Sequence, residues 1–187
     1  MNEVEIKFAV DDVAALESKL RELGFRLQTP STHELNTCYD FPNGQLRKRG
    51  ELLRLRKYGS TWTLTHKAPA HSRVHKARIE TETQVSDGEK MDAILQILGL
   101  KHGFRYEKFR AEWSDGRGHV VIDQTPIGKF AEIEGEADWI DRTAAALAVS
   151  GKQYITVNYA QLFDDWRKRT GSGADEMTFK AIGTPLP

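Results

Sequence analysis

Residues 2–10 read NEVEIKFAV, and up to Phe8 the charged and apolar side chains alternate. Successive side chains of a β-strand point to opposite faces of a sheet, so this alternation gives each face its own character. The apolar face carries Val4, Ile6 and Phe8, and the ionic face carries Glu3, Glu5 and Lys7. The stretch therefore predicts a strand with one face in a hydrophobic core and a row of charges on the other.

The same period of two recurs along the chain and predicts eight strands. Their expected ranges are residues 2–10, 33–41, 52–58, 61–68, 76–85, 104–114, 118–124 and 129–137. Short connections that contain Gly or Pro separate several of them, which is typical of antiparallel neighbours. Seven strands carry a row of charges, which beyond the first strand consists chiefly of Arg54, Arg56, Lys67, Arg78, Glu80, Glu82, Lys108, Arg110, Asp123, Glu132 and Glu134.

Helical periodicity appears three or four times, and the helices are expected after Asp12, after Asp87, over residues 139–149 and from Tyr159 to Trp166. The first two have an aspartate as candidate N-cap and a glycine at their end. The last has an apolar stripe at i, i+3, i+4 and i+7, the spacing of a helix that packs against a core.

The length of 187 residues favours a single domain with a sizeable core. We expect this domain to cover residues 1–168. No periodic pattern follows Trp166, so residues 169–187 are expected to form a mobile C-terminal tail.

The 27 Lys and Arg residues equal the 27 Asp and Glu residues, so the formal net charge is zero. A neutral chain gives no electrostatic reason to expect a nucleic-acid or membrane partner. The single cysteine, Cys38, excludes an internal disulfide framework and a cysteine-based zinc cluster. No leader and no apolar run of membrane length is visible, so we expect a cytoplasmic protein. We expect it to be a monomer or a homodimer.

Any one row of charges is explained by the solvated outer face of an antiparallel sheet. Seven such rows together with three or four amphipathic helices favour a different arrangement. We expect an α+β fold in which eight antiparallel strands form a closed β-barrel, with the helices packed outside and the charges in the lumen.

Charges in a lumen are costly unless they are paired or bind a ligand. Carboxylate oxygens are preferred ligands of Mg²⁺, which commonly bridges one or two carboxylates to substrate phosphates. Arginine and lysine side chains bind phosphate oxygens. A cavity with both kinds of group predicts a site for a polyphosphate and its metal ion.

The sequence motifs that contain these residues also resemble those of a known protein family. Glu3-x-Glu5-x-Lys7 resembles the ExExK signature of the CYTH family, also called triphosphate tunnel metalloenzymes. The similarity continues through Leu53-Arg54-Leu55-Arg56, Trp62 to Lys67, Arg78-x-Glu80-x-Glu82, Lys108-x-Arg110, Asp123, Gly128 to Glu134 and Asn158 to Leu162. The ordered set is far more specific than ExExK alone. The family groups class IV adenylyl cyclases with thiamine triphosphatases and inorganic tripolyphosphatases.

The resemblance implies an eight-stranded tunnel that binds a small-molecule triphosphate, with Mg²⁺ or Mn²⁺ as cofactor. By the same resemblance, the metal ligands or residues around them would be Glu3, Glu5, Glu80, Glu82, Asp123, Glu132 and Glu134. The triphosphate would be held by Lys7, Arg54, Arg56, Lys67, Arg78, Lys108 and Arg110. Glu132, Glu134 and Lys67 are the expected catalytic residues, with one of the two glutamates orienting a water molecule.

The expected activity is hydrolysis of a triphosphate, either inorganic tripolyphosphate, a nucleoside triphosphate or thiamine triphosphate. Thiamine triphosphate is less favoured, because the thiamine triphosphatases carry Tyr-Tyr-Asp where this chain has Cys38-Tyr39-Asp40. An adenylyl cyclase that converts ATP to cyclic AMP and pyrophosphate is the first alternative. A non-catalytic module that binds polyphosphate or nucleotide is the second.

Overall fold

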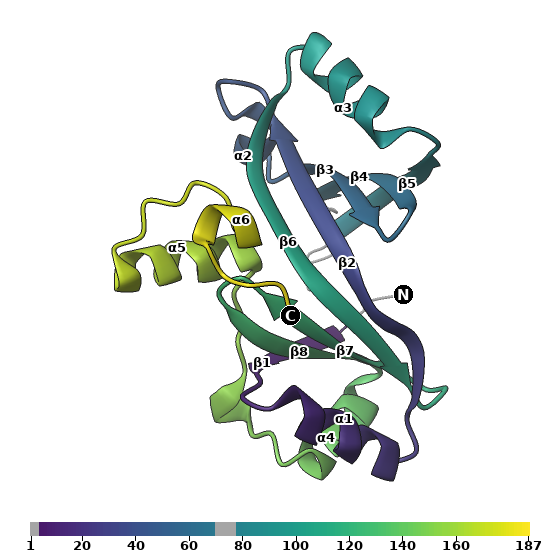
Figure 1. Cartoon of the computed structure of the whole chain (residues 1–187). Coiled ribbons are helices and arrows are strands. Elements are labelled where there is room, and N and C mark those ends of the chain that lie inside the picture. Colours follow the sequence, from purple (N-terminus) through teal and green to yellow (C-terminus); the bar gives the residue numbers. More distant parts are fainter. Residues whose placement is uncertain (1–3, 70–77) are drawn as a thin grey trace. The chain divides into compact units, whose positions relative to one another are not determined.

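A computed structural model of the chain describes residues 4–69 and 78–187. The fold is α+β, with eight antiparallel strands in one sheet of order β1-β8-β7-β6-β2-β3-β4-β5 (Figure 1). The strands are β1 (Val4–Ala9), β2 (Arg26–Asp40), β3 (Leu52–Tyr58), β4 (Thr61–Pro69), β5 (Arg78–Val85), β6 (Lys101–Ser114), β7 (His119–Thr125) and β8 (Gly128–Gly135). The helices are α1 (Val13–Glu22), α2 (Gln45–Lys48), α3 (Gly88–Ile97), α4 (Ala137–Ala146), α5 (Tyr159–Thr170), α6 (Phe179–Ile182) and the 3₁₀ helix η1 (Gly151–Gln153).

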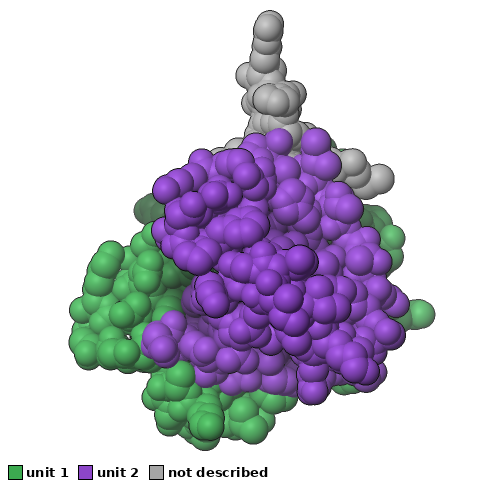
Figure 2. Space-filling model, turned by 90° about the horizontal axis from the view of Figure 1, so that it is seen from above, with its two compact units in different colours: residues 1–32, 108–174, 179–187 green, residues 33–107, 175–178 purple. Residues whose placement is uncertain are grey.

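The chain divides into two units (Figure 2), and each unit has its own core. Unit 1 contains the described residues of 1–32, 108–174 and 179–187, and unit 2 contains those of 33–107 and 175–178. Strands β2 and β6 each begin in one unit and end in the other.

All eight strands expected from the alternation are present, and most bounds agree within two residues. The main difference is β2, which starts at Arg26 instead of residue 33. Residues 26–32 of this strand are almost all exposed on both faces, so they have no alternation of apolar and polar side chains that a sequence pattern could reveal.

The expected helices are confirmed, and side chains cap three of them. The Oδ1 atoms of Asp12 and Asp87 accept hydrogen bonds of 3.0 Å from the backbone N–H groups of Ala15 and Lys90. Asn158 caps α5 in the same way. None of the described helices is long and apolar enough to cross a membrane.

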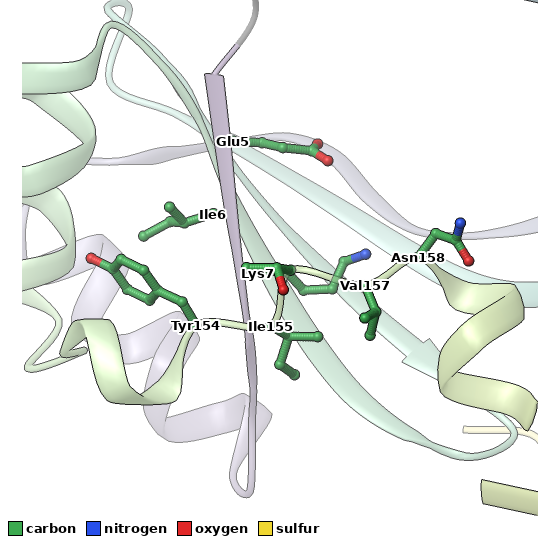
Figure 3. Close-up of a pocket in the computed structure, with 8 residues that line it drawn as sticks. Glu5, Ile6, Lys7, Tyr154, Ile155, Val157 and Asn158 are labelled. Carbon is green, nitrogen blue, oxygen red and sulfur yellow. The ribbon is translucent and has the colours of Figure 1, made fainter. Parts of the chain in front are cut away.

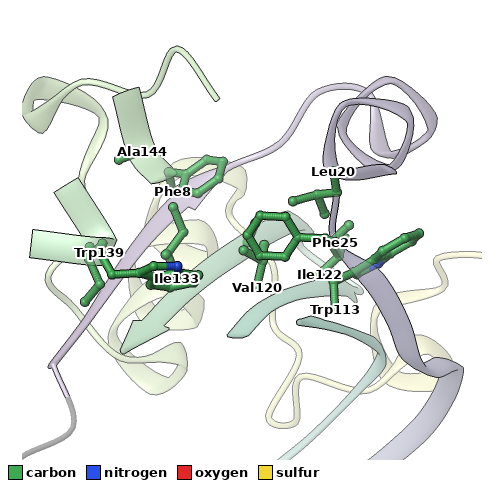
Figure 4. Close-up of a cluster of buried hydrophobic side chains, with 11 residues drawn as sticks. Phe8, Leu20, Phe25, Trp113, Val120, Ile122, Ile133, Trp139 and Ala144 are labelled. Atoms are coloured by element: carbon green, nitrogen blue, oxygen red, sulfur yellow. The ribbon is translucent and has the colours of Figure 1, made fainter. Parts of the chain in front are cut away.

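The core of unit 1 lies between the sheet and helices α1 and α4 (Figure 4). The buried side chains come from both helices and from strands β1, β6, β7 and β8, and they include Phe8, Leu20, Trp113, Ile122, Ile133 and Trp139. Burying this apolar area is the main stabilising contribution to the unit.

The core of unit 2 lies between strands β2, β3 and β4 and helices α2 and α3. It contains Tyr39, Leu46, Leu55, Leu95 and Leu100. Helix α3 begins directly against an indole ring, because a Cβ added at Gly88 would lie only 2.0 Å from Trp62 Cδ2. Only glycine allows so close an approach at this position.

The closed barrel expected from the sequence is not confirmed. The sheet begins with β1 and ends with β5, and these two edge strands do not pair with each other among the described residues. What the structure establishes is the eight-stranded antiparallel sheet with helices.

The C-terminal segment packs against earlier parts of the chain. Met177 is fully buried, and its backbone forms hydrogen bonds with Arg105 and Glu107 of β6. Phe179 packs edge-on against Phe109 in unit 1. These partners lie about 70 residues earlier in the chain, so a local sequence period could not predict this packing.

Candidate functional site

The charged rows of unit 1 lie together on the face of the sheet opposite its hydrophobic core. Glu5 and Lys7 of β1 stand opposite Glu134 and Glu132 of β8. On β6, Arg110 stands opposite Asp123 of β7. Ile6 pairs with Ile133 on the other face, which confirms the alternation of β1 and β8.

Three carboxylates of this face form a cluster that could hold a metal ion. One carboxylate oxygen from each of Glu5, Glu132 and Glu134 lies within 4.8 Å of the others. Glu3, the first residue of the predicted metal set, lies outside the described residues. A set of three carboxylates suits a hard cation such as Mg²⁺ or Mn²⁺.

Ion pairs connect this cluster to the cations beside it. Glu132 Oε1 lies 3.0 Å from Lys7 Nζ, and its Oε2 lies 2.7 Å from Arg110 Nη2. Arg110 also donates two hydrogen bonds of 2.7 Å to the two oxygens of Asp123. Lys108 Nζ completes the network at 2.9 Å from Asp123 Oδ2. Bidentate and charge-assisted bonds of this kind hold the side chains in defined positions.

Asp123 is the buried centre of this network, with no exposed surface. Burial by itself would raise the pKa of its carboxyl group, but the charges and hydrogen bonds of Lys108 and Arg110 outweigh burial and hold the pKa well below its ordinary value. Asp123 is therefore ionised at neutral pH and keeps two cations in place.

Tyr159, the first residue of α5, is a site residue that the sequence analysis did not assign. Its hydroxyl donates a 2.7 Å hydrogen bond to Asp123 Oδ2. The ammonium groups of Lys7 and Lys108 lie 4.3 Å and 5.1 Å from the centre of its ring. The apolar stripe that Tyr159 shares with Phe163 predicts packing, and no sequence signal indicated a polar contact.

Burial, followed by the negative charges of Asp123 and Glu132, raises the pKa of Tyr159 well above its ordinary value. Its hydroxyl is therefore protonated at any physiological pH and acts as a hydrogen-bond donor.

The charged rows of unit 2 also share one face of the sheet, opposite the core of that unit. Lys67 of β4 lies 2.5 Å from Glu80 Oε1 of β5. Two residues away on each strand, the hydroxyl of Thr65 donates a 2.7 Å hydrogen bond to Glu82. Arg78 is placed opposite Pro69 at the start of β5.

Arg54 and Arg56 lie on this same face, opposite Thr65 and Thr63 of β4. The Nε atoms of both arginines are buried, and these two atoms have no hydrogen-bond partner among the described residues. Arg54 also donates a hydrogen bond to the hydroxyl of Tyr106. A buried donor without a partner is costly, so both side chains fit a site that an anion would complete.

The structure thus gathers the predicted site residues into two sets. Unit 1 brings together Glu5, Lys7, Lys108, Arg110, Asp123, Glu132 and Glu134. Unit 2 places Arg54, Arg56, Lys67, Glu80 and Glu82 on one face. The roles expected for these residues stay predictions.

Comparison with known proteins shows which domain family this chain resembles. The family model of the CYTH domain matches residues 1–152. A protein of Methanocaldococcus jannaschii that is named as a candidate adenylate cyclase is 30% identical over 135 residues, which are 72% of this chain and 77% of that protein.

Solved structures share the fold. A candidate adenylate cyclase from Vibrio parahaemolyticus superimposes with a TM-score of 0.74 at 20% identity, covering 87% of this chain and 97% of that one. A protein from Hippeastrum, named as a candidate adenylyl cyclase with a dominant triphosphatase activity, superimposes with a TM-score of 0.63 at 16% identity, covering 88% and 96%. The match over residues 1–152, together with the ordered charges on β1, β6, β7 and β8, shows that this chain belongs to the CYTH domain family.

Proposed function

We propose that the protein is a divalent-metal-dependent enzyme that hydrolyses a triphosphate. The observation that carries this proposal is the carboxylate cluster of Glu5, Glu132 and Glu134 directly beside the cations Lys7 and Arg110. A cluster of carboxylates next to a cluster of cations matches the two parts of a metal–polyphosphate complex.

Glu5, Glu132 and Glu134 are the residues that would hold Mg²⁺ or Mn²⁺. When bound, such an ion supplies a Lewis acid that polarises phosphate oxygens and neutralises developing charge. The contacts of Asp123 favour a different role for this carboxylate. Because both of its oxygens already accept bonds from Lys108, Arg110 and Tyr159, we assign Asp123 to holding these groups in position.

The ion pairs of unit 1 also suggest how a complex could be accommodated. Glu132 neutralises Lys7 and Arg110 in the absence of a ligand. If Glu132 instead binds the metal ion, Lys7 and Arg110 become available to phosphate oxygens. With Glu132 holding the metal ion and Lys7 and Arg110 binding phosphate, little buried charge would be left uncompensated.

Hydrolysis requires a water molecule in line with the phosphorus–oxygen bond that breaks. Glu134 or Glu132 would accept a hydrogen bond from this water and, as it attacks phosphorus, take up its proton. Lys108 and Arg110 would stabilise the negative charge that collects on the leaving diphosphate oxygen. On the charged face of unit 2, Arg54, Arg56 and Lys67 would provide further cations for phosphate oxygens.

The name of the M. jannaschii relative favours adenylyl cyclase as a second candidate function. In that reaction the ribose 3′-hydroxyl attacks the α-phosphorus of ATP, its proton passes to a base, and pyrophosphate leaves. The same charged groups could serve either reaction, because the two differ mainly in the nucleophile.

Product analysis separates the candidates. We expect the protein to release inorganic phosphate from tripolyphosphate or ATP in the presence of Mg²⁺ or Mn²⁺. Formation of cyclic AMP and pyrophosphate from ATP would instead identify the cyclase. Strong binding without any product under either metal would identify a non-catalytic module.

A further inference from the structure

The cations of unit 1 are held by carboxylates, which also neutralise them. Lys7 lies 3.0 Å from Glu132 Oε1, and Figure 3 shows its side chain on the same side of β1 as that of Glu5. Arg110 donates two hydrogen bonds to Asp123. An anion that binds either cation must therefore compete with a negative charge of the protein.

Arg54 of unit 2 is held in a different way. Its guanidinium donates a hydrogen bond to the hydroxyl of Tyr106 on β6, while its buried Nε has no hydrogen-bond partner in the part of the chain that the structure describes. Burial raises the pKa of Tyr106 to about 12, although the positive charge of Arg54 acts in the opposite direction. The hydroxyl is therefore uncharged at neutral pH, so it orients the guanidinium without cancelling its charge.

Glu34 of β2 is a carboxylate whose charge acts on both Arg54 and Tyr106. Its Oε1 accepts a 2.8 Å hydrogen bond from the amide of Asn36, and both side chains are buried. Glu34 thus supplies part of the counter-charge of Arg54, and Tyr106 supplies a fixed hydrogen-bond acceptor. Charge compensation and orientation are therefore the work of different side chains.

The ring and the backbone of Tyr106 are both fixed. Its ring stacks on Phe104, with centroids 5.1 Å apart and an angle of 17° between the planes. The N–H of Glu107 donates a 3.0 Å hydrogen bond to the carbonyl oxygen of Met177, and the N–H of Met177 donates a 2.9 Å bond to the carbonyl oxygen of Arg105. These two bonds lie on either side of Tyr106, which forms an isolated parallel bridge with Met177.

Met177 belongs to the segment of residues 175–178, which lies in unit 2. Its side chain is fully buried, and the neighbouring Glu176 forms a 3.1 Å ion pair with Arg105. The segment lies beyond residue 152, where the family match ends. A segment outside the matched region thus fixes this part of β6.

We infer that Tyr106 is a positioning residue, which orients the guanidinium of Arg54 toward an anion and is itself held in place by residues 175–178. The inference rests on the proposed function, in which Arg54 binds a phosphate oxygen. Arginine binds phosphate through a planar fork, so the orientation of the guanidinium matters as well as its charge. Removing the hydroxyl of Tyr106 should therefore weaken anion binding, although no charge is removed.

The test is a double-mutant cycle on the Kd of bis(phosphonomethyl)phosphinate with Mg²⁺, measured by isothermal calorimetry. This tripolyphosphate mimic has methylene bridges that cannot be hydrolysed, so the measurement does not depend on turnover. Tyr106→Phe keeps the stacked ring, and we expect it to raise Kd about tenfold, the effect of one lost hydrogen bond to a charged group. In an Arg54→Ala background the same substitution should change Kd by less than about twofold, because the side chain that it positions is gone.

Met177→Ala loosens the segment of residues 175–178 and should raise Kd with the same dependence on Arg54. It also provides a second variant in case Tyr106→Phe does not fold. Tyr39→Phe is the matched control, because Tyr39 lies on the opposite face of the same sheet, where its hydroxyl binds Asp92. This control should lower Tm and leave Kd within about twofold of the wild type.

A rise in Kd that is equally large with and without Arg54 would overturn the inference, as would an unchanged Kd in folded Tyr106→Phe or no binding by the wild type. An unchanged Kd in folded Met177→Ala would overturn the part assigned to residues 175–178. Failure of the proposed hydrolysis is a separate result, which appears as binding of the mimic without phosphate release from tripolyphosphate.

Discussion

The hydroxyl of Tyr159 lies 2.7 Å from Oδ2 of Asp123, and through this contact the first residue of α5 joins the charged face of the sheet. Asp123 in turn holds Lys108 and Arg110. The position of two proposed phosphate-binding side chains therefore depends on a residue that lies outside the strands.

Replacing Tyr159 by Phe should impair the site while keeping the ring beside Lys7 and Lys108. We expect a loss of about 1.5–3 kcal/mol in the free energy of unfolding, the usual contribution of a hydrogen bond to a charged group. Turnover of the triphosphate should also fall, because Asp123 loses one of the donors that fix its orientation. Urea denaturation and steady-state kinetics measure the two effects.

Tyr154→Phe is the matched control, since Tyr154 lies five residues before Tyr159, and the bonds recorded to Asp123 come from Lys108, Arg110 and Tyr159. It should leave the free energy of unfolding within about 0.5 kcal/mol of the wild type. Equal effects of the two substitutions would contradict the role assigned to Tyr159.

Asp123→Asn should be strongly destabilising, because it leaves Lys108 buried without its counter-charge. Removing one partner of a buried ion pair costs about 3–5 kcal/mol. Urea denaturation at neutral pH measures the loss. Asp165→Asn removes an exposed carboxylate of α5 and should change stability by less than about 0.5 kcal/mol. A small effect at Asp123 would show that the network contributes little to stability.

Stability should also fall in acid because of Asp123. Its pKa is held low in the folded protein, whereas an unfolded aspartate titrates near pH 3.9. The stabilisation is therefore complete above about pH 4 and is lost as the pH falls toward the folded pKa. Thermal unfolding between about pH 5 and pH 2 should show a shallower acid slope for Asp123→Asn than for the wild type. Parallel slopes would be inconsistent with the low pKa.

Glu134→Gln should weaken the binding of Mn²⁺, because one of three clustered carboxylates loses its charge. We expect at least about a tenfold higher Kd, equivalent to about 1.4 kcal/mol. Isothermal calorimetry measures this change, and Glu22→Gln, an exposed residue of α1, is the control. Equal Kd values for the two variants would place the metal elsewhere.

Gly88→Ala should destabilise unit 2, since its Cβ would overlap the indole ring of Trp62. Overpacking of this kind costs about 1–3 kcal/mol. A Cβ added at Gly173 has no other atom within 4 Å, so Gly173→Ala provides a comparison at an open position. Differential scanning calorimetry should give a clearly lower Tm only for the first variant. If both variants melt together with the wild type, α3 does not depend on this close approach.

Alternation of residue types was sufficient to predict the strands and the ionic face. The pairing of Lys7 with Glu132 follows from the face on which each residue lies, once β1 and β8 are neighbours. The sequence pattern could not predict whether the sheet closes, because closure depends on whether the two edge strands pair. The closed barrel that we expected is not confirmed.

Local sequence patterns also could not predict contacts between segments that lie far apart in the chain. Tyr159 has the spacing of a core residue, and only its position beside Asp123 reveals a polar role. Met177 lies in a stretch without periodicity, yet it is buried against β6. In both cases the partner is set by tertiary packing, which period and propensity do not encode.

We propose that the carboxylate cluster and its neighbouring cations carry out metal-dependent chemistry on a triphosphate. The most direct measurement is phosphate release from tripolyphosphate and ATP by the wild type and by Glu132→Gln, with Mg²⁺ or Mn²⁺ and with EDTA. We expect phosphate release that requires the metal and is lost in Glu132→Gln. Absence of release from both substrates under both metals, or release that persists in EDTA, would contradict it.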